Sequence, residues 1–314
     1  MPTPTNGKTA LVTGGAGFIG SHVVDRLVAL GYRVAVLDNL STGRTQNLHP
    51  AAALHVADVN DPSIPEIFQQ VKPNLVFHLA AQISVSASVR EPIADGQTNV
   101  LGMLRVLEAV KACGVEKIIY SSTGGALYGE PQTHPCSEEH PIAPLSPYGL
   151  SKYLAELYIL LYYRLHGLDY TILRYGNVYG PRQDPHGEAG VVAIFTQAML
   201  EGRGVKIFGD GFQERDFVYV GDVAEANIQA IGKGTGGAYN IGTGHGSTVN
   251  QVFQLLQQCT GYQEAAEYTP PRPGDVYRIS LSHRKAAAEL GWQPQVSLEE
   301  GLRHTVEYFR NRRG

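Results

Sequence analysis

The alternation of short apolar runs with amphipathic segments in the first half of the chain most constrains its fold. The apolar runs are bounded by turn residues and have the length and composition of buried strands. The segments between them have helical spacing, and the first ends at Gly31. Strands separated by helices pair in parallel, with helices on both faces. We therefore predict an α/β protein with a doubly wound parallel sheet, whose strands are TALVTGG, YRVAVLD, AALHVAD, PNLVFHLAA, VEKIIYSS and DYTILRYGNVYG.

The sequence changes character after Gly180. Glycine, proline and charged residues become frequent in PRQDPHGEAG, GDGFQERD and TPPRPGD, with short elements between them and two helices towards the end. This pattern predicts a second, smaller α/β domain at the carboxyl edge of the sheet. We place the sheet domain at residues 1–178, with 217–242 packing back onto it, and the smaller interleaved domain at 179–314.

Composition excludes several classes of function. The net charge of -4 gives no support to nucleic-acid binding, which needs a basic stripe or a high pI. No apolar run approaches the length of a membrane span, and the amino-terminal residues lack the pattern of a secretion signal. Three scattered cysteines form no metal or redox spacing, so we expect no metal site. We expect a soluble protein of the cytoplasm.

Three glycines mark the junction of the first strand and first helix. Gly14, Gly17 and Gly20 are spaced G-x-x-G-x-x-G, which lets the backbone turn sharply and approach a pyrophosphate at the positive end of the helix. No Lys-Ser/Thr follows them, which excludes a Walker-type phosphate loop. The motif therefore predicts a dinucleotide-binding turn.

Two acids at strand ends indicate which dinucleotide binds. Asp38 ends the second strand, where a carboxylate can accept both ribose hydroxyls and would repel a 2′-phosphate. This favours NAD over NADP as the cofactor. Asp58 follows the third strand and can accept from the adenine amino group, although a solvated loop acid is an equally good interpretation of that residue.

A catalytic set is predicted from three residues. Tyr148 and Lys152 lie four apart at the start of a helix and so share one face. A free tyrosine titrates near pH 10, and a neighbouring ammonium together with the positive nicotinamide ring would lower that pKa. Thr123 offers a hydroxyl from an adjacent strand end. We predict that Tyr148 removes a proton from a sugar carbinol while hydride passes to NAD.

Motifs along nearly the whole chain resemble one family. TGGAGFIGSH, DNLSTG, HLAAQISV, YGLSK, LRYGNVYGPRQ, GDGFQERDFVYVGDVA and RPGD are similar to the extended short-chain dehydrogenase/reductases, and within them most similar to the UDP-glucose 4-epimerases. The resemblance implies a Rossmann-type sheet with a smaller substrate domain. It also implies NAD-dependent inversion at C4 of a nucleotide sugar, UDP-glucose or UDP-galactose, through a transient 4-keto sugar.

The resemblance also implies further contacts. It places along the cofactor Phe18, Ile19, Asn39, Ser41, Thr42, Gly43, Val59, Leu79, Ala80, Ala81, Gln82, Asn99, Ser121, Ser122 and Tyr175. It places along the substrate Ser84, Asn177, Val191, Phe208, Arg215, Arg272 and Asp275, besides Thr123 and Tyr148. The planar guanidinium group of an arginine suits phosphate oxygens. The position that limits sugar size falls near Ile279, which is smaller than the tyrosine of stricter epimerases, so N-acetylated sugars are alternative substrates. Uronic-acid sugars are a further alternative.

Gly124 and Gly125 follow Thr123 at the position where related 4,6-dehydratases and UDP-glucuronate decarboxylases carry an acid. Without a second acid or base, elimination at C6 has no evident catalyst, and epimerisation needs none. Those two activities are the nearest alternatives. An NAD-sensing regulatory protein without catalysis is a third, and an NADP-dependent reductase is disfavoured by Asp38.

The helix KYLAELYILLYYRLHG is apolar nearly all round. We expect Leu154, Leu157, Leu161 and Leu165 to cover the sheet, with Tyr158 and Tyr162 beside that stripe. A helix apolar on every side is buried on more than one side. Together with the helix VLGMLRVLEAV it predicts a homodimer through a four-helix contact.

Overall fold

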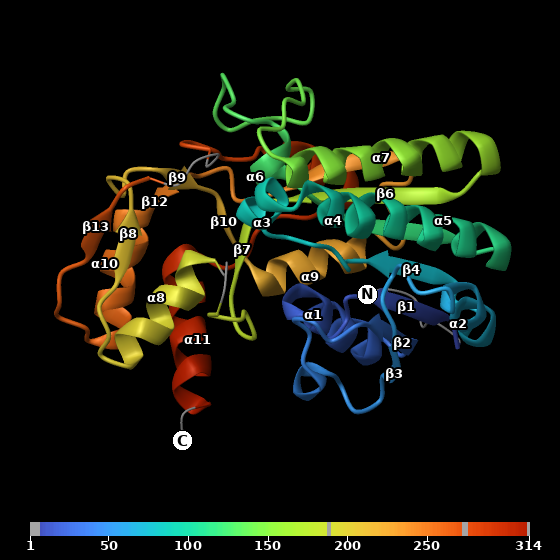
Figure 1. The fold of residues 1–314 in the computed structure, drawn as a ribbon, viewed down its shortest axis with the longest axis horizontal. Coiled ribbons are helices and arrows are strands. Elements are labelled where there is room, and N and C mark those ends of the chain that lie inside the picture. The colour runs from blue at the N-terminus through green and yellow to red at the C-terminus, as the bar shows by residue number, and fades with distance from the viewer. Residues whose placement is uncertain (1–6, 187–189, 272–275, 313–314) are drawn as a thin grey trace.

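The computed structural model describes residues 7–186, 190–271 and 276–312. Its central feature is a seven-stranded parallel sheet in the order β11-β6-β5-β4-β1-β2-β3 (Figure 1). The strands are β1 (Thr9–Thr13), β2 (Arg33–Asp38), β3 (Ala53–Val56), β4 (Leu75–His78), β5 (Lys117–Thr123), β6 (Asp169–Tyr175) and β11 (Gly237–Ile241). The order reverses between β1 and β4, and ligands of such sheets bind at the carboxyl ends of the strands beside this point.

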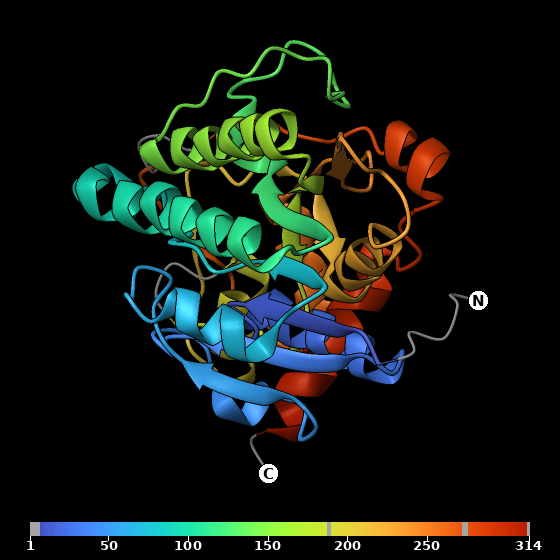
Figure 2. The ribbon, with the colours of Figure 1, turned by 90° about the vertical axis from the view of Figure 1, so that its right-hand side faces the viewer.

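Helices cover both faces of the sheet, as the sequence predicts. On one face lie α1 (Phe18–Ala29) and α9 (Val220–Gln229), which pack against each other. On the other lie α2 (Ile64–Val71), α5 (Gly102–Cys113) and α7 (Pro147–His166) (Figures 1 and 2). Successive residues of β1 point to opposite faces: Ala10 and Val12 join the first core, and Leu11 joins the second.

The remaining chain forms a smaller unit around its own core. Helices α8 (Val191–Leu200), α10 (Val249–Thr260) and α11 (Leu298–Asn311) pack together beside three two-stranded sheets. These sheets pair β7 (Asn177–Tyr179) with β10 (Phe217–Tyr219), β9 (Glu214–Arg215) with β12 (Ser247–Thr248), and β8 (Lys206–Phe208) with β13 (Glu267–Thr269). The chain returns to the large sheet through α9 and β11.

Short helical segments complete the architecture. They are η1 (Thr45–Asn47), α3 (Val85–Arg90), α4 (Pro92–Gly96), η2 (Gln97–Leu101), α6 (Gly124–Leu127) and η3 (Ala286–Leu290). In the described ranges no helix combines the length and the apolar character needed to cross a membrane.

Two details of the predicted elements are wrong. The strand expected over DYTILRYGNVYG is broken at Gly176, where the backbone passes so close to Asp216 that a Cβ would lie 2.7 Å from its carbonyl oxygen. The leucine stripe of α7 does not cover the sheet. Ala155 and Ile159 are buried against it instead, and the leucines lie on another side of the helix, where they are 36–64% exposed. These exposed leucines are Leu154, Leu157, Leu161 and Leu165.

Candidate active site at the carboxyl edge of the sheet

A cavity of about 810 Å³ lies where the carboxyl ends of the central strands meet. Its wall includes the residues that follow or end β1, β2, β4, β5 and β6, together with the first turns of α7. This is the crevice that the reversal of strand order predicts.

The glycine turn fits a pyrophosphate. Gly14 has a φ of +68°, and a Cβ there would lie 2.7 Å from the backbone nitrogen of Ala80. A Cβ on Gly20 would lie 2.1 Å from the carbonyl oxygen of Gly14. Gly17 is the N-cap residue of α1, and its helix end carries no side-chain cap. The turn thus brings the positive end of α1 to the cavity without a side chain in the way.

Asp38 is buried at the end of β2 and lines the cavity. Its Oδ2 accepts from the Ala16 amide at 2.9 Å, and its Oδ1 accepts from the Leu40 amide at 2.8 Å. Each carboxylate oxygen keeps a further lone pair for a ligand hydroxyl. A negative charge fixed at this place fits the ribose of NAD and repels a 2′-phosphate.

Asp58 also lines the cavity, and its carboxylate already has partners in the protein. Its Oδ2 accepts from Asn39 Nδ2 at 2.7 Å and its Oδ1 accepts from the Asn60 amide at 2.8 Å. This side chain therefore shapes the loop after β3, whatever further contact it makes.

Thr123, Tyr148 and Lys152 come together at the other end of the cavity and all three line it. The Thr123 side chain lies near enough to the Tyr148 hydroxyl to favour its phenolate form. Lys152 is buried one turn along α7, with its Nζ 4.5 Å from the centre of the Tyr120 ring. Pro147 and the N-cap Ser146, whose hydroxyl accepts from the Gly149 amide, start the helix immediately before Tyr148.

Burial shifts the two titratable groups in opposite directions. It raises the pKa of Tyr148 to about 12, opposed by the neighbouring Thr123 side chain and reinforced by Asp95. It lowers the pKa of Lys152 to about 7, opposed by Glu156 and Asp95. Without the cofactor, burial penalises the phenolate of Tyr148 more than Thr123 favours it. The expected lowering of this pKa depends on the positive nicotinamide ring as well and stays a prediction.

A buried polar network supports the wall beside the catalytic end. Asn99 Nδ2 donates to Gln82 O at 2.9 Å and to Ser151 Oγ at 3.1 Å, and its Oδ1 accepts from the Gln82 amide at 2.9 Å. Asp95 Oδ1 accepts from Gln82 Nε2 at 2.8 Å. Asn99 thus holds the loop after β4 in place and does not itself line the cavity.

The structure places most residues expected from the resemblance on the cavity wall. Of the cofactor set, only Gly43 and Asn99 are off the wall, and Gly43 packs against the Asp38 carboxylate. Of the substrate set, five line the cavity, namely Ser84, Thr123, Tyr148, Asn177 and Arg215. Val191 and Phe208 do not, although Gly190 beside Val191 does. Arg272 and Asp275 lie outside the described residues.

Ile279 does not take the position expected of it. The side chain is buried with Tyr128, Cys136 and Leu281 and is absent from the cavity wall, where Val276 lies instead. Ile279 itself therefore does not face the cavity, and Val276, three residues before it, is the neighbouring residue that does. Which residue limits sugar size stays a prediction.

The segment that follows β7 lines the cavity in a way that the sequence analysis missed. Arg182 Nη2 contacts Asp25 Oδ2 at 2.7 Å, and Asp184 Oδ2 accepts from Arg44 Nη2 at 3.1 Å. The carbonyl oxygen of Pro181 lies 2.9 Å from His22 Nε2. These contacts join this segment to α1 and to the loop after β2. Their sequence separations exceed a hundred residues, so no local pattern could reveal them.

The two glycines after Thr123 differ in their surroundings. A Cβ on Gly124 would lie 2.4 Å from Leu281 Cδ1, so a side chain there would require the buried Leu281 side chain to move. Gly125 lines the cavity, and a Cβ there would meet only Asn177 Oδ1, at 3.5 Å, and Thr123 Oγ1, at 3.9 Å. Among the described residues of the wall, carboxylates occur at Asp38, Asp58 and Asp184, and none stands beside Thr123.

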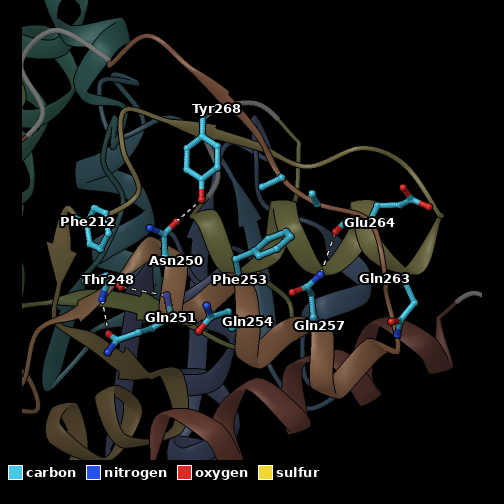
Figure 3. A pocket seen from close by; sticks show the side chains of 12 residues that line it. Phe212, Thr248, Asn250, Gln251, Phe253, Gln254, Gln257, Gln263, Glu264 and Tyr268 are labelled. Carbon is cyan, nitrogen blue, oxygen red and sulfur yellow. Dashed lines mark hydrogen bonds between the residues drawn. The ribbon is translucent and has the colours of Figure 1, made fainter.

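A second cavity of similar size, about 790 Å³, lies in the smaller unit beside α10 (Figure 3). Its wall consists mostly of amide and aromatic side chains, and several amides are already hydrogen-bonded within it. Tyr268, for example, donates to Asn250 Oδ1 at 3.0 Å. The second cavity lacks the glycine turn, Tyr148 and Lys152 that line the first. Because the two volumes are similar, the chemical groups on the wall identify the first cavity as the candidate active site.

Comparison with known proteins agrees with this geometry. Residues 10–242 match the NAD dependent epimerase/dehydratase family. The chain is 50% identical to a putative UDP-glucose 4-epimerase of Methanocaldococcus jannaschii, over 96% of this chain and 98% of that one. It is 55% identical to the crystal structure of a UDP-glucose 4-epimerase from Thermotoga maritima with UDP-glucose, with a TM-score of 0.96 and coverage of 98% and 100%. A Thermus thermophilus UDP-glucose 4-epimerase in complex with NAD is 47% identical, with a TM-score of 0.93 and coverage of 96% and 99%.

Proposed function

This chain belongs to the NAD dependent epimerase/dehydratase family, and from that premise we propose that it interconverts UDP-glucose and UDP-galactose by inversion at C4. The observation that carries the proposal is that Thr123, Tyr148 and buried Lys152 line the same cavity as the glycine turn and Asp38. When bound, NAD accepts hydride from the sugar C4 and later returns it.

The residues of the chain have separate roles in this reaction. Thr123 orients the C4 hydroxyl, and Tyr148 as phenolate takes its proton. The ammonium of Lys152 favours that phenolate, since an opposite charge nearby lowers a phenol's pKa. The sugar is left as a 4-ketone. After the sugar turns to present its other face, the Tyr148 hydroxyl returns the proton to the C4 oxygen, and the phenolate is restored.

The surroundings of Thr123 favour epimerisation over elimination or decarboxylation. The Leu281 side chain packs closely against Gly124, and no described wall residue offers a carboxylate at this end of the cavity. A second proton-transfer group acting at C5 is therefore missing from the described wall. The open space at Gly125 leaves room beside the reacting carbon.

Product analysis tests the proposal. Purified protein given UDP-galactose should yield UDP-glucose by NMR without steady accumulation of NADH. Tyr148→Phe should lower kcat by about 10³-fold while keeping bound NAD, within the usual contribution of a general base. A decarboxylated or dehydrated product, net NADH, or full activity of Tyr148→Phe would each contradict the proposal.

We also propose that the working unit is a homodimer formed by α5 and α7. These helices pack side by side on one face of the molecule (Figure 2). Leu157 and Leu161 of α7, at 42% and 44% exposure, belong to the outward leucine stripe, and the exposed Leu150 continues it along the helix. Such a self-complementary apolar strip suits a second copy related by a twofold axis.

Oligomeric state tests this part of the proposal. Leu157→Glu with Leu161→Glu should convert a dimer to a monomer by light scattering after gel filtration. Val56→Glu is the matched control, because Val56 is also an exposed apolar residue but lies on β3. A monomeric parent protein would contradict the dimer.

All three cysteines are free, which suits the reducing cytoplasm, and cell fractionation would check this location.

A further inference from the structure

A buried ion pair lies directly beneath the catalytic residues. Glu156 and Arg174 have side chains that are 5% and 8% exposed, and Arg174 Nη2 lies 2.6 Å from Glu156 Oε2. Arg174 Nε also donates to Glu156 Oε1 at 3.0 Å, so the contact is bidentate. Neither residue lines the cavity. Any effect of the pair on the reaction therefore passes through the residues that line it.

The ion pair connects α7, β5 and β6 beside Thr123. Glu156 is on α7, four residues after Lys152 and eight after Tyr148, so all three share one side of the helix. Its Oε1 also accepts from Ser122 Oγ at 2.5 Å, and Ser122 immediately precedes Thr123 on β5. Arg174 is on β6, in register with Ser122. One carboxylate thus holds α7 against the strand that carries Thr123.

A second set of hydrogen bonds fixes Arg174. Its Nη1 donates to the Tyr128 hydroxyl at 2.9 Å, and that hydroxyl donates to Asn240 Oδ1 at 2.8 Å. The guanidinium also lies 5.5 Å from the centre of the Tyr128 ring. Arg174 thus has hydrogen bonds to Glu156 and to Tyr128 and a contact with the Tyr128 ring, which together leave its side chain little freedom to move. The Glu156 carboxylate is therefore held in one position.

Stability alone is a weak reason for such a pair. Desolvating two charges costs about as much as their attraction returns, and apolar replacements of similar volume are often neutral or stabilising. What an apolar pair could not reproduce is a negative charge one turn from Lys152 and a directional bond to Ser122. The charge acts on Lys152, and the bond positions the strand that carries Thr123, so both features bear on the reaction and not on the packing of the core.

We propose that Glu156, held by Arg174, is a positioning residue for the reaction: it sets the distance between Tyr148 and Thr123 and keeps Lys152 in its ammonium form. This inference rests on the proposed function for those three catalytic residues. Glu156 acts on them through the helix backbone, through Ser122 and through its charge.

The charges around Lys152 determine what loss of Glu156 would do. Asp95 from α4 and Glu156 from α7 both raise the pKa of Lys152, which burial lowers to about 7. The other groups that face it are neutral near pH 7. Burial raises the pKa of Tyr148 and Tyr120, and it lowers the pKa of His78 to about 3. Removing Glu156 therefore lowers the pKa of Lys152 further, and the ammonium is lost at lower pH.

The kinetic test uses the NAD-loaded enzyme. In Glu156→Gln, kcat should fall about tenfold or more at pH 8 with little change in KM. The basic limb of the plot of kcat against pH should move to lower pH by about one pH unit. A nearby opposite charge shifts a pKa by about 1–3 units, so this is the smallest shift expected. Glu156→Asp, which keeps the charge, should recover the position of that limb.

Two further variants separate positioning from structure. The double variant Glu156→Met with Arg174→Met removes both charges at similar side-chain volume. Its midpoint of thermal unfolding should stay near that of the parent protein. Its kcat should be low, and the basic limb of its pH profile should be shifted as in Glu156→Gln. Asp222→Asn removes another buried carboxylate, whose Oδ2 accepts from the Gln295 and Val296 amides and which does not line the cavity. It should lower the midpoint without moving the limb.

The outcomes are distinct. A parent-like pH profile and kcat in the double methionine variant would overturn the proposal. If that variant does not fold, equal pH profiles for Glu156→Gln and Glu156→Asp would overturn it instead. Failure of the proposed function would be seen separately, as full activity of Tyr148→Phe.

Discussion

The cofactor side and the substrate side of the cavity are built in different ways. The cofactor side consists of one βαβ unit, in which Gly14, Gly20 and Asp38 follow each other within twenty-five residues and stand on the central sheet. The substrate side is assembled from segments far apart in the chain, with Asn177, Arg215 and Val276 on short strands or loops. Local backbone geometry therefore determines the first side, and long-range packing determines the second.

This difference has an energetic consequence. A change in the glycine turn acts on the backbone of β1 and α1, so it should disturb cofactor binding and folding together. A change in one substrate-side residue removes one side chain from a wall made of several segments, so it should alter substrate binding and leave the cofactor in place. Four substitutions test this contrast, in order of decreasing effect.

Gly20→Val should have the largest effect. A Cβ at this position would lie 2.1 Å from the Gly14 carbonyl oxygen, and that oxygen belongs to the backbone and cannot move aside cheaply. We expect the free energy of unfolding to fall by about 3 kcal/mol, at the upper end for overpacking, and bound NAD to be lost. Denaturant unfolding and the NAD content per chain would measure both. Gly232→Ala is the control, since a Cβ there meets nothing within 4 Å. Retained NAD with parent stability would contradict this view of the turn.

The same contrast explains which parts of the site could be predicted from the sequence. The glycine turn, Asp38 and the pair Tyr148 and Lys152 were predictable, because each depends on spacing within a strand end or a helix turn. The ion pair of Arg44 with Asp184 was not, because it joins residues 140 apart in the chain. The outward direction of the α7 leucines was also missed. A helix that is apolar all round does not reveal which side faces the sheet.

Arg215→Met should have the next largest effect, on substrate binding alone. Arg215 lines the cavity from β9, where its Nη1 donates to the Glu214 carbonyl oxygen at 3.0 Å. Charge-assisted bonds to phosphate contribute about 1.5–3 kcal/mol, so we expect KM for the UDP-sugar to rise about 10–100-fold. NAD content should not change. Arg278→Met is the control, because Arg278 pairs with Glu214 at 2.8 Å but does not line the cavity. Equal effects of the two variants would mean that Arg215 acts only on the local fold.

Asp38→Asn should weaken cofactor binding moderately without unfolding the turn. The amide keeps one acceptor oxygen, but its NH₂ group would face the amide of Ala16 or Leu40, which now donates to the carboxylate. We expect about tenfold weaker NAD binding, and a smaller preference for NAD over NADP because the repelling charge is gone. Titration of both dinucleotides by fluorescence would show this. Unchanged discrimination would mean that another group excludes the 2′-phosphate.

Arg44→Met should have the smallest effect, and it tests the place where the two sides touch. Arg44 follows the cofactor-side strand β2, and Asp184 lies in the segment after β7. Both line the cavity, and their side chains are 45% and 34% exposed. An ion pair as exposed as this contributes about 0.2–1 kcal/mol and is screened by salt. We therefore expect NAD to dissociate about two- to fivefold faster at low salt, with a smaller difference at high salt.

A reversed pair makes this last prediction specific. Arg44→Asp combined with Asp184→Arg should restore slow release if the charges act on each other, whereas either change alone should speed release. Arg203→Met is the matched control, since Arg203 pairs with Glu201 on the surface away from the cavity. If the reversed pair releases NAD as fast as the single variants, the segment after β7 is held by Arg182 and His22 instead. The two sides would then be joined through α1, which belongs to the same βαβ unit as the glycine turn.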